Sequence, residues 1–342
     1  MILAQGGDAD FGIVEEVRGK KAKFYTLEGV MGVWWGKDRQ YYRGDVAFQM
    51  QYDEGFYGRF SLVSFNEYLL TPSVGVKDLY VEKVFDNGLD IKFGLGSLYW
   101  ENGVLFGDYL GGNPFLDVFF GKSVWTDLLL YKVGANLGAG IRGAIDLGSF
   151  GITLYGVYDT ARVGYAGLSI NVDVPFWTLS LEATGSQTSG NYEGAYITST
   201  FVRPGKWFAG LMSYSFSPGF RRIAAQGLDL DPERSPFFGV STPLTYSMPG
   251  IPWSDPRNSS AEVVRFGFNH SLNEDWTVVP IFDFGAYQSA ALDMKRNSVL
   301  ADIHVRLNWT DTYYVGVSVG TLINDSTSSW GFALYSVKSF SF

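Results

Sequence analysis

The fold of this chain is decided by stretches such as Ser298–Trp309, which reads SVLADIHVRLNW. Apolar Val299 and Ile303 alternate there with polar Asp302 and Arg306. Successive side chains of a β-strand point to opposite faces, so the alternation predicts a strand with one apolar and one polar face. It continues for about ten residues, which is the length that a strand needs to cross a membrane, whereas strands of soluble proteins are usually about half as long.

The same alternation recurs along most of the chain, for example in Asp45–Asp53, Leu89–Trp100 and Val163–Val174. It divides the chain into about sixteen strands, with fourteen or eighteen as the alternatives. In the last of these examples we expect Ile170 to face lipid and its neighbour Ser169 to face a wet interior. The pattern therefore predicts an all-β protein, a transmembrane antiparallel β-barrel that is apolar outside and polar inside.

The composition argues against several other classes of protein. The chain has 342 residues, of which 42 are glycine and 17% are aromatic, as is typical of strands and tight turns. It has no cysteine and only two histidines, His270 and His304, so we predict no zinc centre. We also expect no other metal and no cofactor. The net charge of -9 argues against a nucleic-acid partner. No apolar run approaches the roughly 18 residues of a membrane-spanning helix.

The connections between the predicted strands differ at the two ends of the barrel. Every second one is a tight turn, while the others include the long segments 101–130 and 218–260. Because outer-membrane barrels have short periplasmic turns and long extracellular loops, we place both chain ends on the periplasmic side. Residues 1–21 are then an N-terminal periplasmic segment and residues 22–342 the barrel. A separate strand at residues 124–135 would put the long segments at opposite ends, so we assign these residues mainly to the loop.

Tryptophan positions support a membrane-spanning barrel. Eight tryptophans lie at or within two residues of a predicted strand end: Trp34, Trp35, Trp100, Trp177, Trp207, Trp276, Trp309 and Trp330. The other two, Trp125 and Trp253, fall in the two long loops. Amphipathic rings gather at the two lipid–water interfaces of such barrels, so we expect these residues to form aromatic girdles.

The end of the chain carries a family resemblance. Tyr335–Phe342 resembles the terminal strand of outer-membrane barrels, with Phe342 last and Phe340 two residues earlier, although Val337 stands where glycine is usual. With the inferred strands and a long loop after the fifth, the chain is similar to bacterial porins. The resemblance implies an outer-membrane location among lipid, a homotrimer, and recognition by the barrel-assembly machinery through Phe340 and Phe342. It also implies that the third extracellular loop folds into the lumen, although Gly111–Phe115 only approximates the Pro-Glu-Phe-Gly-Gly motif of classical porins.

Charged residues on the polar faces are the candidate pore residues. For the constriction we name three acids of the loop and three bases of the wall: Asp108, Asp117, Asp127, Arg59, Lys92 and Arg142. Further lumen-facing charges include Asp78, Glu82, Asp90, Arg265, Asp302 and Arg306. Charge in a narrow aqueous pore biases which ions enter it. Acids outnumber bases on these faces, so we expect a modest preference for cations, unless the bases cluster at the narrowest section.

Three other patterns have competing interpretations. Gly138–Gly143 fits the spacing of a dinucleotide-binding loop, but a strand alternation runs through it, which favours small residues beside a closely packed loop or subunit. His270 or His304 could serve a barrel hydrolase, yet no recognised catalytic signature surrounds either. The apolar segment 113–133 must be buried, by folding into the barrel, by contacting another subunit or by forming a slide for solutes.

The function that follows is passive diffusion. A barrel of about sixteen strands leaves a water-filled channel, so we predict a porin that admits small hydrophilic solutes and ions, constricted by loop 101–130, without enzymatic activity. The alternatives are a barrel that anchors an envelope layer, an outer-membrane hydrolase, and a soluble all-β protein.

Overall fold

The computed structural model describes residues 25–36, 40–53, 55–66, 73–98, 100–101, 103–106, 111–188, 190–223, 259–273, 276–289, 294–309, 313–323 and 328–341. All regular structure in these residues is β-strand. No helix among them is long and apolar enough to span a membrane.

Most connections between consecutive strands are short. Their bounds are β1 Tyr25–Gly36, β2 Gln40–Asp53, β3 Phe56–Asn66, β4 Ser73–Val84, β5 Leu89–Gly96, β6 Asn113–Gly121, β7 Val124–Val133, β8 Asn136–Asp146, β9 Phe150–Asp159, β10 Gly164–Val174, β11 Trp177–Thr188, β12 Asn191–Val202, β13 Trp207–Phe216, β14 Ser259–Phe268, β15 His270–Ser271, β16 Trp276–Ser289, β17 Met294–Trp309, β18 Tyr313–Ile323 and β19 Ser328–Ser341.

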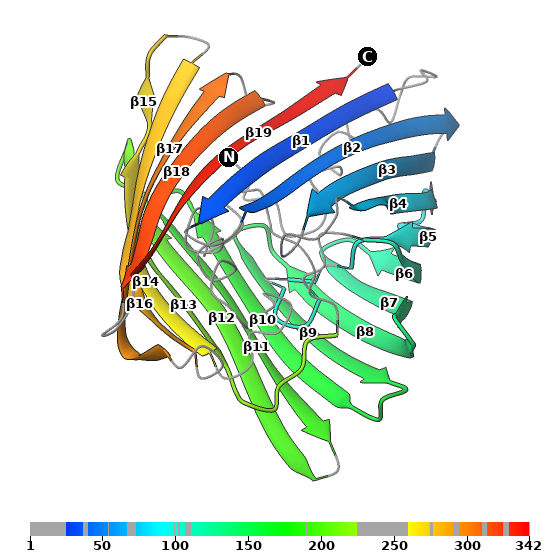
Figure 1. Cartoon of the computed structure of the whole chain (residues 1–342). Helices are drawn as coiled ribbons and strands as arrows, with labels where there is room; N and C mark the ends of the chain where they lie inside the picture. The colour runs from blue at the N-terminus through cyan, green and yellow to red at the C-terminus, as the bar shows by residue number, and fades with distance from the viewer. Residues whose placement is uncertain are drawn as a thin grey trace.

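Every strand pairs with its neighbours in antiparallel register, and β1 pairs with both β2 and β19. The first and last strands therefore meet, for example at Gly32 and Tyr335, and close the sheet into a barrel (Figure 1). The short β15 follows β14 and pairs with the same partner, β16, so the two form one line of strand. Among the described residues, the barrel wall thus has eighteen lines of strand, the larger of the alternatives that the sequence allowed.

The two ends of the barrel carry different connections, as the sequence predicted. At the end where β1 begins and β19 ends, every connection has between two and four residues. The other end holds the two long connections, residues 97–112 and 217–258. Tryptophans mark the short-turn end, since Trp177, Trp207 and Trp276 begin their strands there and Trp309 ends β17 beside Trp276.

The segment after β5 corrects the sequence prediction. Residues 113–133 are not loop but a hairpin, β6 and β7, which belongs to the barrel wall. Residues 124–135, which the sequence analysis assigned mainly to the loop, hold β7 and the turn 134–135 that leads into β8. A hairpin adds two strands, so it keeps the long connections on one end. The requirement that both long connections lie at one end therefore could not distinguish this hairpin from a loop.

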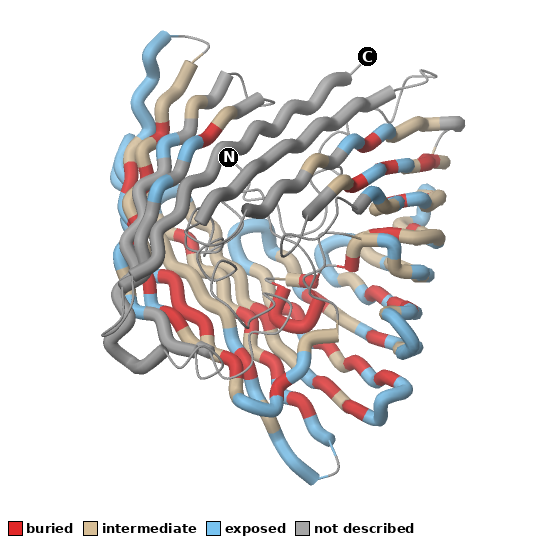
Figure 2. Tube along the Cα trace, viewed as in Figure 1, coloured by how far each residue is buried: buried red, intermediate tan, exposed pale blue. Residues whose placement is uncertain are grey.

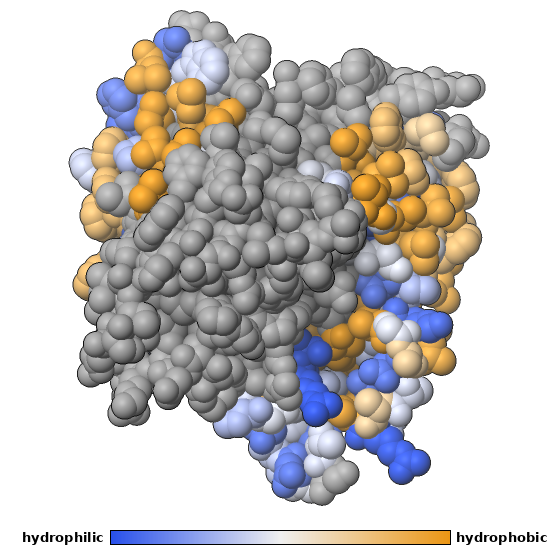
Figure 3. All heavy atoms as spheres, viewed as in Figure 1, coloured by the Kyte–Doolittle hydropathy of each residue, from blue (hydrophilic) through white to orange (hydrophobic). Residues whose placement is uncertain are grey.

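The two faces of the wall match the predicted alternation. Side chains that point outward are exposed and apolar, such as Leu154 and Phe284, both 60% exposed. Those that point inward are buried, and Ser169 has no exposed surface. Figure 2 shows buried and exposed positions alternating along β7 to β9, and Figure 3 shows apolar side chains gathered on the outer surface. This arrangement suits a lipid exterior.

The main apolar cluster lies inside the barrel, against the wall formed by β7 to β14. Residues of the wall and of both long connections compose it: Leu98, Trp100, Val104, Leu105, Phe106, Leu129, Tyr131, Tyr155, Val157, Val163, Tyr165, Ala195, Met212, Tyr214, Phe216, Phe220, Ala261 and Val263. A segment from a loop must therefore enter the barrel to complete this cluster.

Candidate functional site

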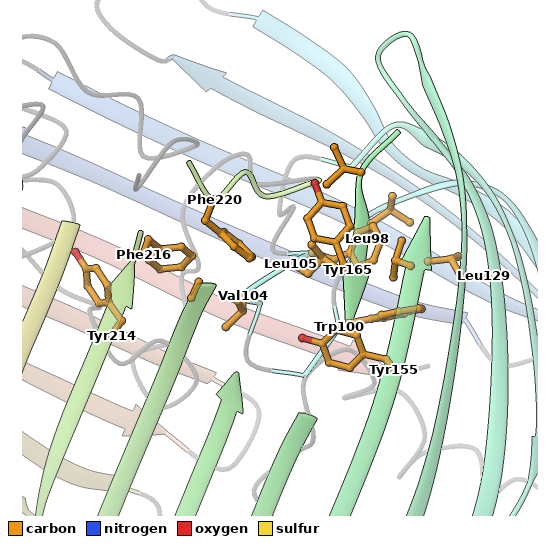
Figure 4. Packing of buried hydrophobic residues seen from close by; sticks show 14 of the residues in the cluster. Leu98, Trp100, Val104, Leu105, Leu129, Tyr155, Tyr165, Tyr214, Phe216 and Phe220 are labelled. Atoms are coloured by element: carbon orange, nitrogen blue, oxygen red, sulfur yellow. The ribbon is translucent and has the colours of Figure 1, made fainter. Parts of the chain in front are cut away.

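The segment 97–106, here called the inner loop, leaves β5, and its described residues, 97–98, 100–101 and 103–106, pack inside the barrel. Val104, Leu105 and Phe106 have no exposed surface, and Trp100 is 3% exposed. The segment folds on itself, because the amide of Gly103 donates to the carbonyl of Trp100 at 2.8 Å and the amide of Trp100 donates to the carbonyl of Phe106 at 3.2 Å. Figure 4 shows its side chains against those of β7, β9 and β10.

Trp100 fills a space that glycine leaves on the wall. A methyl group at Gly140 would lie 2.5 Å from Cη2 of Trp100, so only glycine permits this approach. The Trp100 ring also meets Phe106 and Tyr155 edge to face, at centroid distances of 4.9 and 5.9 Å. Of the glycines in Gly138–Gly143, Gly140 confirms the interpretation of small residues beside a folded-in loop, whereas Gly138 lies against Tyr131 of the neighbouring strand. The assignment of Trp100 to an interfacial girdle is wrong, because the ring is buried in the lumen.

Arg142 of β8 connects the wall to the inner loop. Its Nε donates to Asp127, the residue opposite it on β7, and its Nη1 lies 3.5 Å from Oε1 of Glu101 in the loop. The guanidinium lies over the rings of both Trp100 and Trp125, 5.0 and 5.2 Å from their centroids. Such stacking and ion pairing fix the orientation of an arginine.

Four of the other predicted site residues continue this cluster along the wall. Lys92 of β5 stands opposite both Glu82 of β4 and Asp117 of β6, and its Nζ lies 3.9 Å from Oε2 of Glu82. Asp90, two residues before Lys92, is also buried. Asp117 and Asp127 were predicted in a loop, and this placement is wrong, because both lie on strands. Asp108 lies outside the described residues.

Asp78 and Arg59 form a second pair next to the start of the inner loop. Their side chains approach to 3.4 Å, and the hydroxyl of Ser61 donates to Asp78 at 2.6 Å. The amide of Ser97 donates to the other carboxylate oxygen of Asp78 at 3.2 Å. Asp78 therefore anchors the residue at which the chain leaves β5.

Arg265 lies on β14, six strands along the wall from β8, the strand of Arg142 (Figure 1 labels both strands). It forms two hydrogen bonds of 2.7 Å with Asp283, its cross-strand partner on β16. Asp302 pairs in register with Asp283, and Arg306 with Val279, while the side chains of these two β17 residues lie outside the description.

The second long connection also enters the barrel, which the sequence did not reveal. Phe220 is buried, and its ring lies 6.2 Å from that of Tyr165 and 5.9 Å from that of Phe216. The amide of Ile223 donates to the carbonyl of Leu105 at 3.0 Å. Residues 217–223 therefore pack on the inner loop, and the buried aromatics at 216 and 220 were the available signal.

The inner wall carries more acidic than basic charge among the described residues. Four basic side chains, those of Arg59, Lys92, Arg142 and Arg265, each have a carboxylate within 4.0 Å. Acids that add to these pairs are Asp90, Asp117, Asp159 and Glu182, all on the inner side of their strands. Because charge is only weakly screened in a confined lumen, this excess produces a negative potential there.

Comparison with known proteins shows the fold. No family model matches the chain, and no curated protein matches its sequence. Among solved structures it is similar to OccK5 (OpdH) of Pseudomonas aeruginosa, with a TM-score of 0.68 and 9% identity over 94% of this chain and 99% of that one. OccK2 (OpdF), solved in complex with glucuronate, is similar with a TM-score of 0.64 and 9% identity over 94% of this chain and 98% of that one. OpdK, solved with vanillate, is similar with a TM-score of 0.58 and 10% identity over 94% of this chain and 99% of that one. The chain therefore has the architecture of a porin β-barrel, as its sequence suggested.

The described residues give no support to hydrolase chemistry. His270 lies on β15 at the short-turn end and is exposed, and the side chain of His304 lies outside the description. Within the described part of the chain, no three acidic, histidine or cysteine side chains are grouped as metal ligands would be.

Proposed function

We propose that this protein is an outer-membrane diffusion channel for small hydrophilic solutes and ions, with no enzymatic activity. The closed eighteen-line barrel with an apolar exterior and a charged inner wall carries this proposal, since barrels of that size leave room for an aqueous path. The similarity to porins over 94% of the chain supports it.

The inner loop is the proposed constriction. It occupies the lumen on the side of β7 to β11, and with residues 217–223 it narrows the space left for solutes. This corrects the predicted extent of the loop, 101–130, while keeping its proposed role. The charges that a passing solute would meet beside it include Arg142, Lys92 and Asp117.

The channel is proposed to prefer cations modestly. Two of the similar porins were solved with glucuronate and vanillate, which both carry a carboxylate. In this chain the four basic side chains named above are engaged by carboxylates of the wall, so an anion would have to compete with them. The additional acids favour cations.

The cellular setting is part of the same proposal. The protein would lie in the bacterial outer membrane, with both chain ends in the periplasm and residues 1–21 there as a separate segment. Trimer formation, and recognition by the assembly machinery through Phe340 and Phe342, stay predictions. Phe340 is paired with Leu27 on β1, and Phe342 lies outside the described residues.

Planar-bilayer recording of the purified protein tests the proposal. We expect discrete ohmic conductance steps, and in a KCl gradient a reversal potential of the sign that indicates cation preference. Anion preference would overturn the selectivity but not the channel. Absence of conductance from a folded, inserted barrel would favour the anchor alternative. If the protein hydrolyses esters or peptides, and His270→Ala or His304→Ala abolishes this activity, the hydrolase alternative is favoured.

A further inference from the structure

Glu182 is a carboxylate buried where a barrel wall does not require one. It lies on the inner face of β11, opposite Ser169 of β10, and has no exposed surface. Burial of an acidic side chain is costly unless hydrogen bonds compensate. A buried carboxylate at this position therefore requires hydrogen-bond donors close to it.

One hydrogen-bond donor to Glu182 comes from the backbone of the inner loop. The amide of Val104 donates to Oε2 of Glu182 at 3.0 Å, across 78 residues of sequence. The hydroxyl of Tyr155 donates to Oε1, and it also contacts the hydroxyl of Thr184, so the wall orients the carboxylate toward the loop. Hydrogen bonds to a charged acceptor are stronger than those between neutral groups.

A second attachment holds the same segment from the other side of its turn. Glu101 of the inner loop reaches Arg142, while Trp100 stacks on that guanidinium. Glu101 has a φ of 50°, a left-handed conformation that a non-glycine residue seldom adopts. The backbone accepts this conformation where it brings the Glu101 carboxylate to Arg142.

The second connection covers the segment between these two points. A guanidinium nitrogen of Arg222 donates to the carbonyl of Gly103, and the Ile223 amide binds the carbonyl of Leu105. The backbone from 101 to 105 is thus held at Glu101, Gly103, Val104 and Leu105. An apolar plug held by burial alone would not need these specific polar attachments.

We propose that Glu182 and Arg142 are positioning residues that hold the inner loop against β8 to β11, and so set the width of the constriction. The conclusion about width rests on the proposed channel function, whereas the attachment itself does not. In this arrangement Arg142 acts chiefly through the loop rather than as a selectivity charge. Loss of the Glu182 carboxylate should let the loop leave the wall while the barrel stays closed.

Cysteine accessibility tests the attachment without any recording of current. The chain has no cysteine, so Val104→Cys introduces a single thiol at a buried position. In an otherwise unchanged protein it should react slowly with a charged, water-soluble methanethiosulfonate. Adding Glu182→Ala should accelerate the modification by about tenfold or more, because the loop loses a charge-assisted hydrogen bond. Glu182→Gln, which keeps an oxygen acceptor, should give a smaller increase and serves if the alanine variant does not fold.

Two controls separate loop release from general loosening of the wall. Thr178→Ala changes a buried inward side chain of the same strand, about 13 Å along it from Glu182, and should leave the reactivity at position 104 unchanged. Val279→Cys places a buried thiol on β16, four strands along the wall from β11, and its reactivity should not respond to Glu182→Ala. Equal acceleration at positions 104 and 279 would overturn the proposal, as would no acceleration in either folded Glu182 variant.

Bilayer recording then tests the consequence for the channel. Glu182→Ala should raise the mean conductance and the open-channel noise, and Arg142→Gln should raise the noise in the same way, while Thr178→Ala should do neither. If position 104 becomes reactive but no variant conducts, the attachment holds and the channel function fails. If the channel conducts identically in all variants despite loop release, the inner loop does not set its width.

Discussion

Arg142 on β8 and Arg265 on β14 make the same kind of contact in different parts of the barrel wall, but for different purposes. Each pairs with the aspartate directly opposite it on a neighbouring strand. Arg265 uses two hydrogen bonds of 2.7 Å to Asp283 and is 4% exposed, so its charge is satisfied within the wall. Arg142 is 17% exposed and shares its charge between the wall and the loop residue Glu101.

The difference shows that a loop, not the strand pattern, divides the lumen into two environments. On the β14–β16 side, the arginine–aspartate pair stabilises the sheet itself. On the β7–β11 side, a similar pair holds a segment that has left the sheet. Four substitutions or sets of substitutions test this difference between the two parts of the wall.

The largest effect is expected from removing the acid of the self-contained pair. Asp283→Ala deprives the buried Arg265 of both hydrogen bonds and should destabilise the barrel by about 3 to 5 kcal/mol. Asp127→Ala should cost less, about 1 to 3 kcal/mol, because Arg142 keeps Glu101, two ring faces and some solvent. Urea unfolding in lipid vesicles measures both. Equal losses would show that the two pairs have the same role.

The lipid-facing side should not distinguish the two walls. Arginine in place of Ile170 on β10 or of Phe284 on β16 should destabilise the barrel by about 2 to 4 kcal/mol in either case. Asn171→Arg, on the inner face, should cost far less. Ser169, which the sequence predicts to face a wet interior, is a poor comparison because it is completely buried opposite Glu182. Similar losses at Ile170 and Asn171 would contradict the assignment of faces.

Shortening the inner loop should affect conductance more than stability. Replacement of residues 98–110 by a short glycine–serine linker should raise single-channel conductance severalfold, because the hydrogen bonds that close the barrel belong to the strands. The folded fraction, followed by the circular dichroism of the sheet, should change little. Unchanged conductance in a folded barrel would place the narrowest section elsewhere.

The smallest effect is expected on selectivity. Arg142→Gln should increase cation preference by roughly twofold or less in permeability ratio, because one charge among several is removed. The double change Arg265→Gln with Asp283→Asn removes one charge of each sign and should leave the ratio unchanged. Reversal potentials in a KCl gradient measure both. A shift toward anions in Arg142→Gln would mean that the released loop, not the lost charge, controls selectivity.

The sequence missed the hairpin β6–β7 for a reason that the inner loop explains. Strands with a polar inner face alternate clearly in sequence, as in Ser298–Trp309. In residues 113–133 the inner face carries Phe115 and Tyr131, because that face packs on the loop and on neighbouring aromatics. Apart from Asp117 and Asp127, both faces are therefore apolar, and the alternation that identifies a strand is weakened.

The sequence by itself determined the strand-rich fold, the inside and outside of the wall, and the end at which the long connections lie. These properties depend on side-chain period, turn residues and loop length, which are local. The location of Arg59, Lys92 and Arg142 on the inner face followed from the same period.

Only the tertiary structure decided which charges meet and where the loop packs. Glu182 and Val104 are 78 residues apart, and nothing local in either indicates that a carboxylate will bind that amide. The contact exists because closing the barrel brings β11 opposite the chain that leaves β5. Burial there makes the hydrogen bond to Glu182 valuable, and burial is a property of the assembled barrel rather than of any one strand.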